Sequence, residues 1–230
     1  QARRIFPAGK IEFPFEIKET VSEKTGRVHP KLKDRVGKTF MAAGAYTADP
    51  RGAAHDLIRV AQAYGGVRAS FSQRFWTVTH EAVHGVFRRF MTREHAELLL
   101  SGESHLREIA ASVAPHKAIE ILNGSEGFGE VLSYAAMGWH KVKGEYLTVG
   151  KPDPTWAQPL QKLEQIVDTV KSWLGKKGYR RWDQLFEDIV EGEYVKDRKI
   201  ARRDSLKIGD EMYYFGAFNK SVQDIDFLPA

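Results

Sequence analysis

The sequence predicts a mostly helical α+β fold with a small sheet near the N-terminus. Residues 10–18 alternate apolar and charged side chains as a strand does, although Pro14 suits only an edge or a bulge. Most segments from residue 73 onward have helical spacing of their apolar residues. The chain is 42% hydrophobic and 28% charged, which is compatible with a globular enzyme. We therefore expect a core in residues 1–150 and a helical extension in residues 151–230 that packs on it.

Four further segments precede the first long helix. Residues 37–48 are small and apolar, and they end in a turn signal at residues 49–52. Residues 53–64 have helical spacing and are followed by two glycines, which predicts a helix. Residues 67–72 alternate again, so we expect a short edge strand beside the next helix.

The rest of the chain is predicted to consist of helices separated by short breaks. Thr92 is a candidate N-cap, and Asn123-Gly124 is a break. The aromatic tail at residues 212–218 is expected to be extended. The expected helices cover approximately residues 73–91, 92–101, 104–113, 115–123, 125–139, 155–174 and 182–190.

The most informative segment is His80-Glu81-Ala82-Val83-His84. On a helix, the spacing of four residues places both imidazoles on one face, one turn apart, where they can bind one ion. The flanking residues are mostly apolar, so this helix is expected to be buried. Because the chain has no cysteine, any metal must be held by His, Asp or Glu.

The segment from Thr77 to Val86 fits the zinc-peptidase helix pattern at all ten positions. The chain thus resembles the zincin superfamily of zinc metallopeptidases, which implies a zincin-like core. Metzincins would have Gly and His where this chain has Phe87 and Phe90, so that branch is disfavoured.

A second segment, Ser125-Glu126-Gly127-Phe128-Gly129-Glu130, resembles the second helix of gluzincins, as in the aminopeptidase family. The Glu-x-x-x-Glu spacing also resembles that of lethal-factor-like peptidases. The resemblance implies that Glu126 is the third metal ligand and that Glu130 orients a ligand imidazole. The reverse assignment, with Glu130 as the ligand, stays open.

The resemblance implies hydrolysis of peptide bonds in a protein or peptide substrate. Zn²⁺ would lower the pKa of water to about 7, and Glu81 would act as the general base. Tyr134 and Tyr146 are nearly equal candidates for the donor that stabilises the developing oxyanion, and His140 is a third. The glycines that are candidates for shaping the strand and loop that approach the metal are Gly44, Gly65, Gly66, Gly127 and Gly129.

The net charge of +5 is concentrated in the last third of the chain, which suggests an alternative function. In this alternative, an inactive zincin-fold module binds nucleic acid or another anionic partner through a basic surface. An ordinary solvated face explains the same charges, and the intact Glu81 argues against an inactive enzyme. The basic residues are Lys171, Lys176, Lys177, Arg180, Arg181, Lys196, Arg198, Lys199, Arg202, Arg203 and Lys207.

The context of the chain is suggested by three observations. No stretch approaches 18 apolar residues, so no transmembrane span is expected, and residues 1–4 lack a signal-peptide core. The chain is expected to be trimmed or cut from something longer. The segment from Gly178 to Gly192 resembles a segment of large phage polyvalent proteins that carry metallopeptidase domains, which suggests a toxin, an effector or a phage-protein domain. The sequence indicates neither a compartment nor an oligomer.

Overall fold

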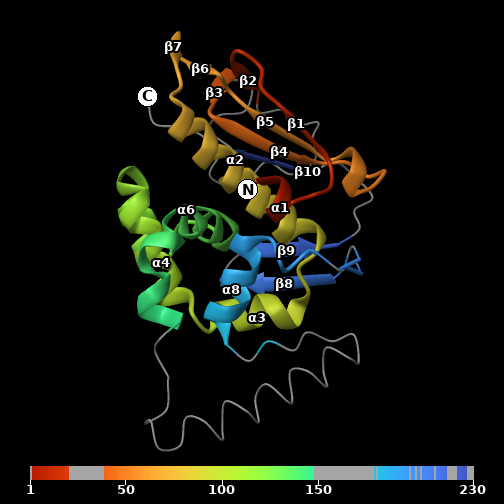
Figure 1. The fold of residues 1–230 in the computed structure, drawn as a ribbon, viewed down its shortest axis with the longest axis vertical. Coiled ribbons are helices and arrows are strands. Elements are labelled where there is room, and N and C mark those ends of the chain that lie inside the picture. The colour runs from red at the N-terminus through yellow and green to blue at the C-terminus, as the bar shows by residue number, and fades with distance from the viewer. Residues whose placement is uncertain are drawn as a thin grey trace, which may run out of the picture.

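The fold is α+β, as predicted, and helices form the larger part of it (Figure 1). The computed structural model describes residues 2–20, 39–147, 179, 181–196, 198–199, 201–202, 204–209, 211–216 and 222–226. The helices are α1 (Ala2–Ile5), α2 (Phe71–Arg89), α3 (Arg93–Leu100), α4 (Glu103–Val113), α5 (Ala118–Leu122), α6 (Phe128–Leu147) and α8 (Trp182–Glu191). Two short 3₁₀ helices are η3 (Ala53–His55) and η4 (Pro115–Lys117).

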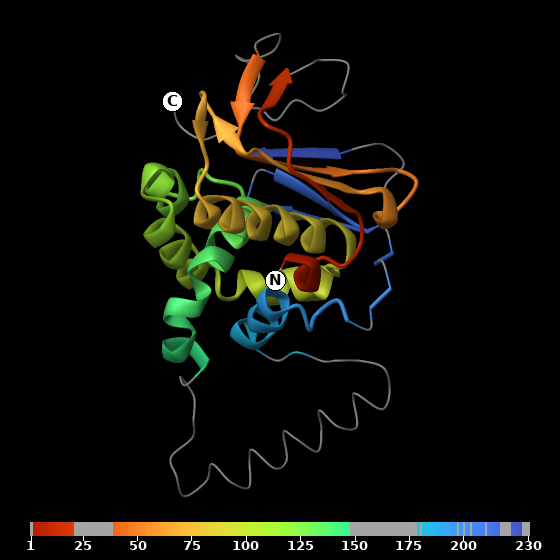
Figure 2. The same ribbon diagram turned by 45° about the horizontal axis from the view of Figure 1, so that its top comes forward.

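The main sheet has four strands in the order β1-β5-β4-β10 (Figure 2). Strand β1 is parallel to β5, whereas β4 is antiparallel to both of its neighbours, β5 and β10. The other strands form two-stranded sheets, β2-β3, β6-β7 and β8-β9. The strands are β1 (Lys10–Glu12), β2 (Ile17–Thr20), β3 (Thr39–Ala42), β4 (Gly44–Ala48), β5 (Leu57–Val60), β6 (Ala63–Tyr64), β7 (Val67–Arg68), β8 (Asp204–Ile208), β9 (Glu211–Phe215) and β10 (Val222–Asp226).

Helix α2 lies between the main sheet and α6 and is the centre of the molecule (Figure 1). It starts at a capping box, in which the Ser70 hydroxyl accepts from the Gln73 N–H and the Gln73 side chain accepts from the Ser70 N–H. Its apolar residues on opposite sides pack on the sheet and on α6, so most of the helix from Val78 onward is buried. The sequence therefore builds a central helix whose polar residues from Thr79 to His84 face protein and not solvent.

The last turn of α2 is completed by the distant end of the chain. The Gly216 N–H donates to the Arg88 carbonyl at 2.6 Å, and the Ala201 N–H donates to the Arg89 carbonyl at 2.8 Å. Helix ends leave their last carbonyls without partners inside the helix, and these two bonds supply partners. The described residues after 178 and the residues before 150 thus share one core.

Helix α6 is fixed on its other sides by α4 and α8. A Cβ at Gly138 would lie 2.9 Å from Val113 of α4, so the two helices approach closely there. The Trp139 indole donates to Glu187 of α8, and Lys143 pairs with the same carboxylate at 2.9 Å. These contacts hold α6 helical beyond residue 139, where the sequence predicted its end.

The predicted helix at residues 53–64 is wrong. Only η3 is helical there, and the chain continues as β5 and β6. The apolar residues of β5 mimic helical spacing, but its side chains alternate between half-buried and buried, as in a sheet. Buried Asp56, bonded to Tyr46 and Arg89, fixes the chain just before β5.

The predicted strand at residues 67–72 is reduced to β7, which pairs with β6 in a hairpin away from the main sheet. Ser70 already caps α2, so the strand cannot continue. The segment at residues 10–18 splits at Pro14 into β1 and β2, which belong to different sheets. Residues 155–174, predicted as a long helix, lie outside the described residues.

The remaining predicted elements agree with the structure. Thr92 caps α3 by accepting from the His95 N–H at 3.3 Å. Helices α4 and α8 match their predicted ranges within one residue, and β9 forms the extended aromatic segment. Among the described helices none is both long and apolar enough to cross a membrane.

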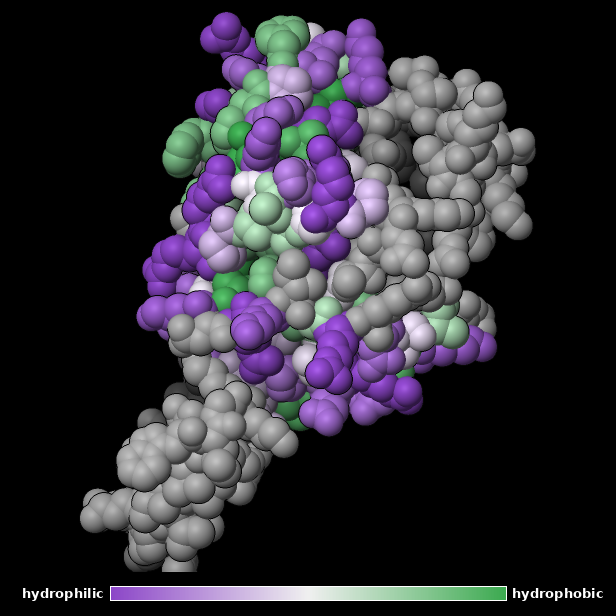
Figure 3. Space-filling model, turned by 90° about the vertical axis from the view of Figure 1, so that its right-hand side faces the viewer, coloured by the Kyte–Doolittle hydropathy of each residue, from purple (hydrophilic) through white to green (hydrophobic). Residues whose placement is uncertain are grey.

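Apolar side chains reach the surface near the small hairpins. Figure 3 shows green patches at the end of the molecule that carries β6 and β7, separated by hydrophilic side chains. Phe13 and Phe15 are 48% and 58% exposed, and their backbone carbonyls accept from residues 62 and 63 at this end. Val67 of β7 is 72% exposed.

Candidate metal centre

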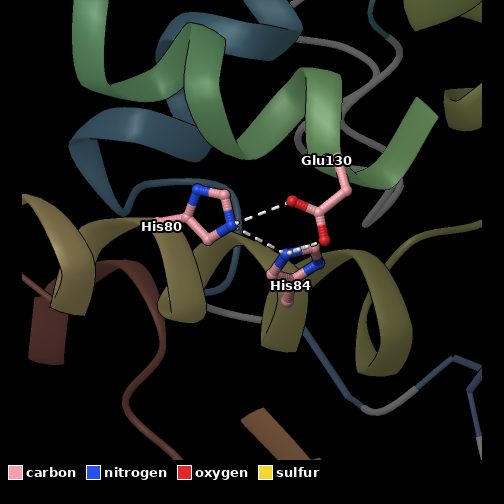
Figure 4. A group of neighbouring side chains, drawn as sticks. All are labelled: His80, His84 and Glu130. Carbon is pink, nitrogen blue, oxygen red and sulfur yellow. Dashed lines mark hydrogen bonds and ion pairs between the residues drawn. The ribbon is translucent and has the colours of Figure 1, made fainter. Parts of the chain in front are cut away.

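Two histidines in the middle of α2 face α6. The side chains of His80 and His84 lie one turn apart on one face of the helix, and their Nε2 atoms are 3.1 Å apart (Figure 4). His80 is 1% exposed and His84 is 5% exposed. The helix thus converges two imidazoles on one buried point, as the spacing predicted.

Glu130, in the first turn of α6, completes the cluster. Its Oε2 lies 3.2 Å from Nε2 of His80, and its Oε1 lies 3.4 Å from Nε2 of His84 (Figure 4). Both carboxylate oxygens therefore point at the same space as the imidazole nitrogens.

These distances suit a zinc ion. A tetrahedral zinc with bonds of about 2.0–2.1 Å holds its ligand atoms about 3.3 Å apart. The three separations of 3.1, 3.2 and 3.4 Å lie close to that value. Two imidazoles and one carboxylate form a frequent catalytic zinc set that leaves a fourth position open. His80, His84 and Glu130 thus fit the metal that the motif implies.

The protonation state of Glu130 also fits. Burial by itself would raise the pKa of this carboxyl, but His84 and His80 lower it well below its ordinary value. An anionic carboxylate is the form that binds a cation. The negatively charged Glu130 carboxylate therefore lies next to the imidazole rings of both His80 and His84.

Glu126, the first choice for the third ligand, lies elsewhere. It precedes α6, its backbone N–H donates to the Glu120 carbonyl at 2.8 Å, and its Oε2 lies 3.9 Å from Nζ of Lys117. Because α6 begins at Phe128, Glu126 lies outside the helix that carries Glu130, whereas the sequence predicted one helix over residues 125–139. The structure brings the alternative ligand, Glu130, to the imidazoles.

Glu81 lies on the side of α2 that faces the sheet. A Cβ at Gly44 of β4 would lie 2.5 Å from Oε1 of Glu81 and 2.6 Å from Cγ2 of Thr77. Only glycine leaves room for the carboxylate there. Glu81 is fully buried. The candidate base is therefore held between the motif helix and β4, next in sequence to His80.

Tyr134 is the predicted oxyanion donor that lies at the cluster. It follows Glu130 by one turn of α6, and its ring centroid is 4.6 Å from that of His80. Its side chain is 3% exposed. This contact orients the imidazole and keeps the tyrosine beside the candidate metal position.

The other two candidate donors lie far along the same helix. Tyr146 is in the last turn of α6, about 24 Å along the axis from Glu130 at about 1.5 Å per residue. The position of its side chain is outside the described part of the structure. His140 lies about 15 Å from Glu130 on the same basis, and its Nδ1 is 3.8 Å from Glu191.

Tyr213 of β9 positions the start of α6. Its hydroxyl accepts a 2.6 Å hydrogen bond from the Phe128 N–H, one of the N–H groups that a helix start leaves unpaired. A Cβ at Gly129 would lie 3.7 Å from the Tyr213 ring and 3.8 Å from Nδ1 of His84. Tyr213 therefore helps to fix the first turn of α6, and with it the position of Glu130 relative to the two imidazoles.

Sequence reasoning gave no role to two residues that lie next to Tyr134. The Lys117 ammonium is 5.3 Å from the centroid of the Tyr134 ring, and the His116 ring centroid is 6.2 Å from it. Both come from η4, whose position depends on how α4 packs on α6. His116 and Lys117 lie more than thirty residues after His84 in the sequence, and no sequence pattern indicates that they come close to Tyr134.

Described basic residues of the last third make contacts within the protein. Arg181 bonds Asp183, Nζ of Lys196 lies 3.2 Å from Glu193, and the Arg198 guanidinium is 4.3 Å from the centroid of the Tyr194 ring. Lys171, Lys176 and Lys177 lie outside the described residues.

Searches of protein-family models, of curated proteins and of solved structures find no match to this chain.

Proposed function

We propose that this chain is a zinc-dependent metallopeptidase with a zincin-like core. His80, His84 and Glu130 would hold the zinc, and Glu81 would be the general base. The observation that carries the proposal is the convergence of three ligand atoms, 3.1 to 3.4 Å apart, from two helices beside a buried glutamate.

The donor set favours zinc among the common metals. Imidazole nitrogen suits zinc, copper, iron and nickel, whereas calcium and magnesium prefer sets made only of oxygen. Two nitrogens and a carboxylate, with no thiolate anywhere in the chain, match the composition of hydrolytic zinc sites. The position of β4 along α2 further supports a zincin-like arrangement, because Glu81 lies between this helix and that strand.

In the proposed mechanism the protein moves one proton twice. Zinc held in this site supplies a Lewis acid that polarises the peptide carbonyl and makes water acidic near neutral pH. Glu81 takes a proton from the attacking water as the new C–O bond forms at the carbonyl carbon. Glu81 then delivers this proton to the amide nitrogen as the C–N bond breaks, so that one carboxyl and one amine result.

Tyr134 is the candidate for stabilising charge on the carbonyl oxygen. A donor aimed at an oxyanion in a water-poor site contributes more than the same donor in water. Tyr134 meets the burial requirement, and its contact with the His80 ring places it at the cluster. We assign it this role as part of the proposal.

The ligand set is tested by metal content. We expect about one zinc per chain in the parent and in Glu126→Gln, which is the matched control on the same segment. His84→Ala and Glu130→Gln should lose zinc, with circular dichroism showing that they fold. Zinc bound equally by all four proteins, or by none after zinc is added back, would contradict the site.

The reaction is tested separately with Glu81→Gln. This variant should keep its zinc and lose hydrolysis of a library of internally quenched peptides by about 10²–10⁴-fold, the usual contribution of a general base. A zinc chelator should stop the parent. Cleavage by Glu81→Gln at the parent rate would exclude the proposed mechanism.

A further inference from the structure

Strand β10 occupies the free side of β4. It pairs with β4 antiparallel over its whole length, from Val222 opposite Ala48 to Asp226 opposite Gly44. Because β5 covers the other side of β4, β10 is the strand that ends the described sheet on the side of β4. Without β10, the backbone groups of β4 would form an open edge.

This edge passes beside the candidate base. Asp226 pairs with Gly44, the residue whose missing side chain leaves room for the Glu81 carboxylate. Neighbouring strands lie about 4.8 Å apart. The backbone of β10 therefore ends about one strand spacing from the backbone that contacts Glu81.

Three of the four residues of the candidate site are buried in this arrangement, and the side chain of the fourth, Glu130, is 21% exposed. His80 and Glu81 are 1% and 0% exposed, and His84 is 5% exposed. A peptide substrate must reach the carbonyl-polarising position, so part of the protein has to move first. Extended peptides commonly bind by adding a strand to an open sheet edge, and the edge nearest Glu81 is the one that β10 fills.

β10 is also suited to be displaced. Among the described strands it pairs with β4 alone, and two of its five residues are aspartates, a residue type that is depleted in strands. The pairing of β4 with β5 is instead part of the core, where Tyr46, Ile58 and Val60 are buried. An incoming strand would therefore replace β10 at lower cost than β5, the other neighbour of β4.

We propose that β10 is an internal occupant of the peptide-binding edge, which holds the site closed until an extended peptide takes its place antiparallel to β4. This inference rests on the proposed function for the identity of the competing peptide. The closing of the site by β10 can be measured without hydrolysis, through the access of a chelator to bound zinc.

The first test locks β10 in place. The chain has no cysteine, so a disulfide can be introduced without competing thiols. Thr47→Cys with Gln223→Cys, and Ala48→Cys with Val222→Cys, each join directly paired residues, and adjacent pairs alternate between the wide and the close type. One of the two designs is therefore of the close type. Oxidised and reduced forms of each protein are compared, with the four single-cysteine variants as controls.

The second test weakens β10 within the full chain. Asp224→Pro together with Ile225→Pro removes two successive N–H groups, and one of them faces β4 because strand N–H groups alternate in direction. Asp224→Asn together with Ile225→Val is the matched control that keeps both N–H groups. Circular dichroism confirms that both variants fold.

The expected result is an ordered series in the rate of zinc transfer to a chelator. Oxidation of the locked protein should slow the transfer about tenfold, and the double-proline variant should speed it about tenfold relative to its control. A tenfold change corresponds to about 1.4 kcal/mol, the net value of one or two hydrogen bonds. Peptide hydrolysis should follow the same order.

The outcomes separate the two proposals. Equal transfer rates in oxidised, reduced and double-proline proteins would overturn the role of β10, and hydrolysis at equal rates would then leave the proposed function standing. The ordered transfer series without hydrolysis in any form would support closure by β10 and contradict the peptidase.

Discussion

Helix α2 contributes to two polar clusters, one around Arg89 and Asp56 and one around His80, His84 and Glu130, and their hydrogen-bonding groups differ. In its last turn Arg89 donates to both oxygens of Asp56 and to the Asp49 carbonyl, and Tyr46 donates to Asp56. In its middle, by contrast, two imidazoles and the Glu130 carboxylate converge on one another.

The difference lies in the balance of donors and acceptors. A guanidinium has five N–H donors and no acceptor, so the cluster at Arg89 is satisfied within the protein. A carboxylate has no donor, and each neutral imidazole has one nitrogen that can only accept. The first cluster stabilises the fold, and under the proposed function a cation completes the second.

The largest expected effect is on the Arg89 cluster. Asp56→Ala leaves a buried guanidinium without its carboxylate, and we expect a loss of about 3–5 kcal/mol in the free energy of unfolding. Urea unfolding measures this loss. Glu97→Gln, which breaks the exposed Arg93 pair on α3, is the control and should cost less than about 1 kcal/mol. Similar losses in both variants would remove the contrast between buried and exposed pairs.

The next effect is on Glu81, the candidate base next in sequence to His80. Gly44→Ala adds a methyl group that lies 2.5 Å from Oε1 of Glu81, so the carboxylate or the helix must shift. We expect a stability cost of about 1–3 kcal/mol and a larger loss of hydrolysis than of bound zinc. Gly144→Ala, on α6 with no atom within 4 Å of the new Cβ, should instead stabilise by about 0.5–1 kcal/mol. Unchanged peptide cleavage by Gly44→Ala would show that Glu81 tolerates displacement.

A pH-dependent effect on stability is expected at His95 of α3. Burial, with the charge of Arg198, lowers the pKa of His95 from its ordinary value of 6.5 to about 4. The ring Nδ1 lies 3.0 Å from the Tyr194 hydroxyl, which in turn donates to the Phe90 carbonyl after α2. Between these pKa values the unfolded chain binds a proton that the folded chain does not, so the free energy of unfolding falls as pH falls from about 6.5 to about 4.

His95→Gln should reduce that fall in the same window. Urea unfolding of parent and variant at pH 7, 6, 5 and 4.5 measures it. Parallel pH profiles for the two proteins would mean that His95 does not titrate differently on folding.

The smallest expected effect is on the position of Glu130. Tyr213→Phe removes the hydrogen bond to the Phe128 N–H and should cost about 1 kcal/mol in stability. Zinc affinity should fall by about 10–100-fold, as for other groups that position a ligand. Competition with a zinc indicator dye measures this change. An unchanged affinity would mean that α6 holds Glu130 without Tyr213.

The helix that carries the candidate metal ligands could be predicted because its signals are local. Histidine spacing, apolar flanks and the cap at Ser70 all lie within residues 70–90, although the sequence placed the helix start at residue 73 and the cap starts it at Phe71. The choice between Glu126 and Glu130 depends on where α6 starts. Distant Tyr213 contributes to that start, and no local pattern records it.

The strands were harder to predict for the same reason. β5 is stabilised by pairing with β1 and β4, and the chain before it is fixed by Arg89, so the helical spacing of residues 53–64 does not decide its structure. The pairing of β10 with β4 joins segments from opposite ends of the chain, and short-range patterns contain no information on it.

The two backbone hydrogen bonds that complete the end of α2 bear on when the protein becomes functional during synthesis. Their donors, Ala201 and Gly216, leave the ribosome more than a hundred residues after Arg89, since the related contact of Arg89 with Gly216 spans 127 positions. Contacts this distant in sequence form late in folding. We therefore expect a nascent chain that stops before residue 201 to contain the whole metal-binding motif and still lack a finished helix to present it.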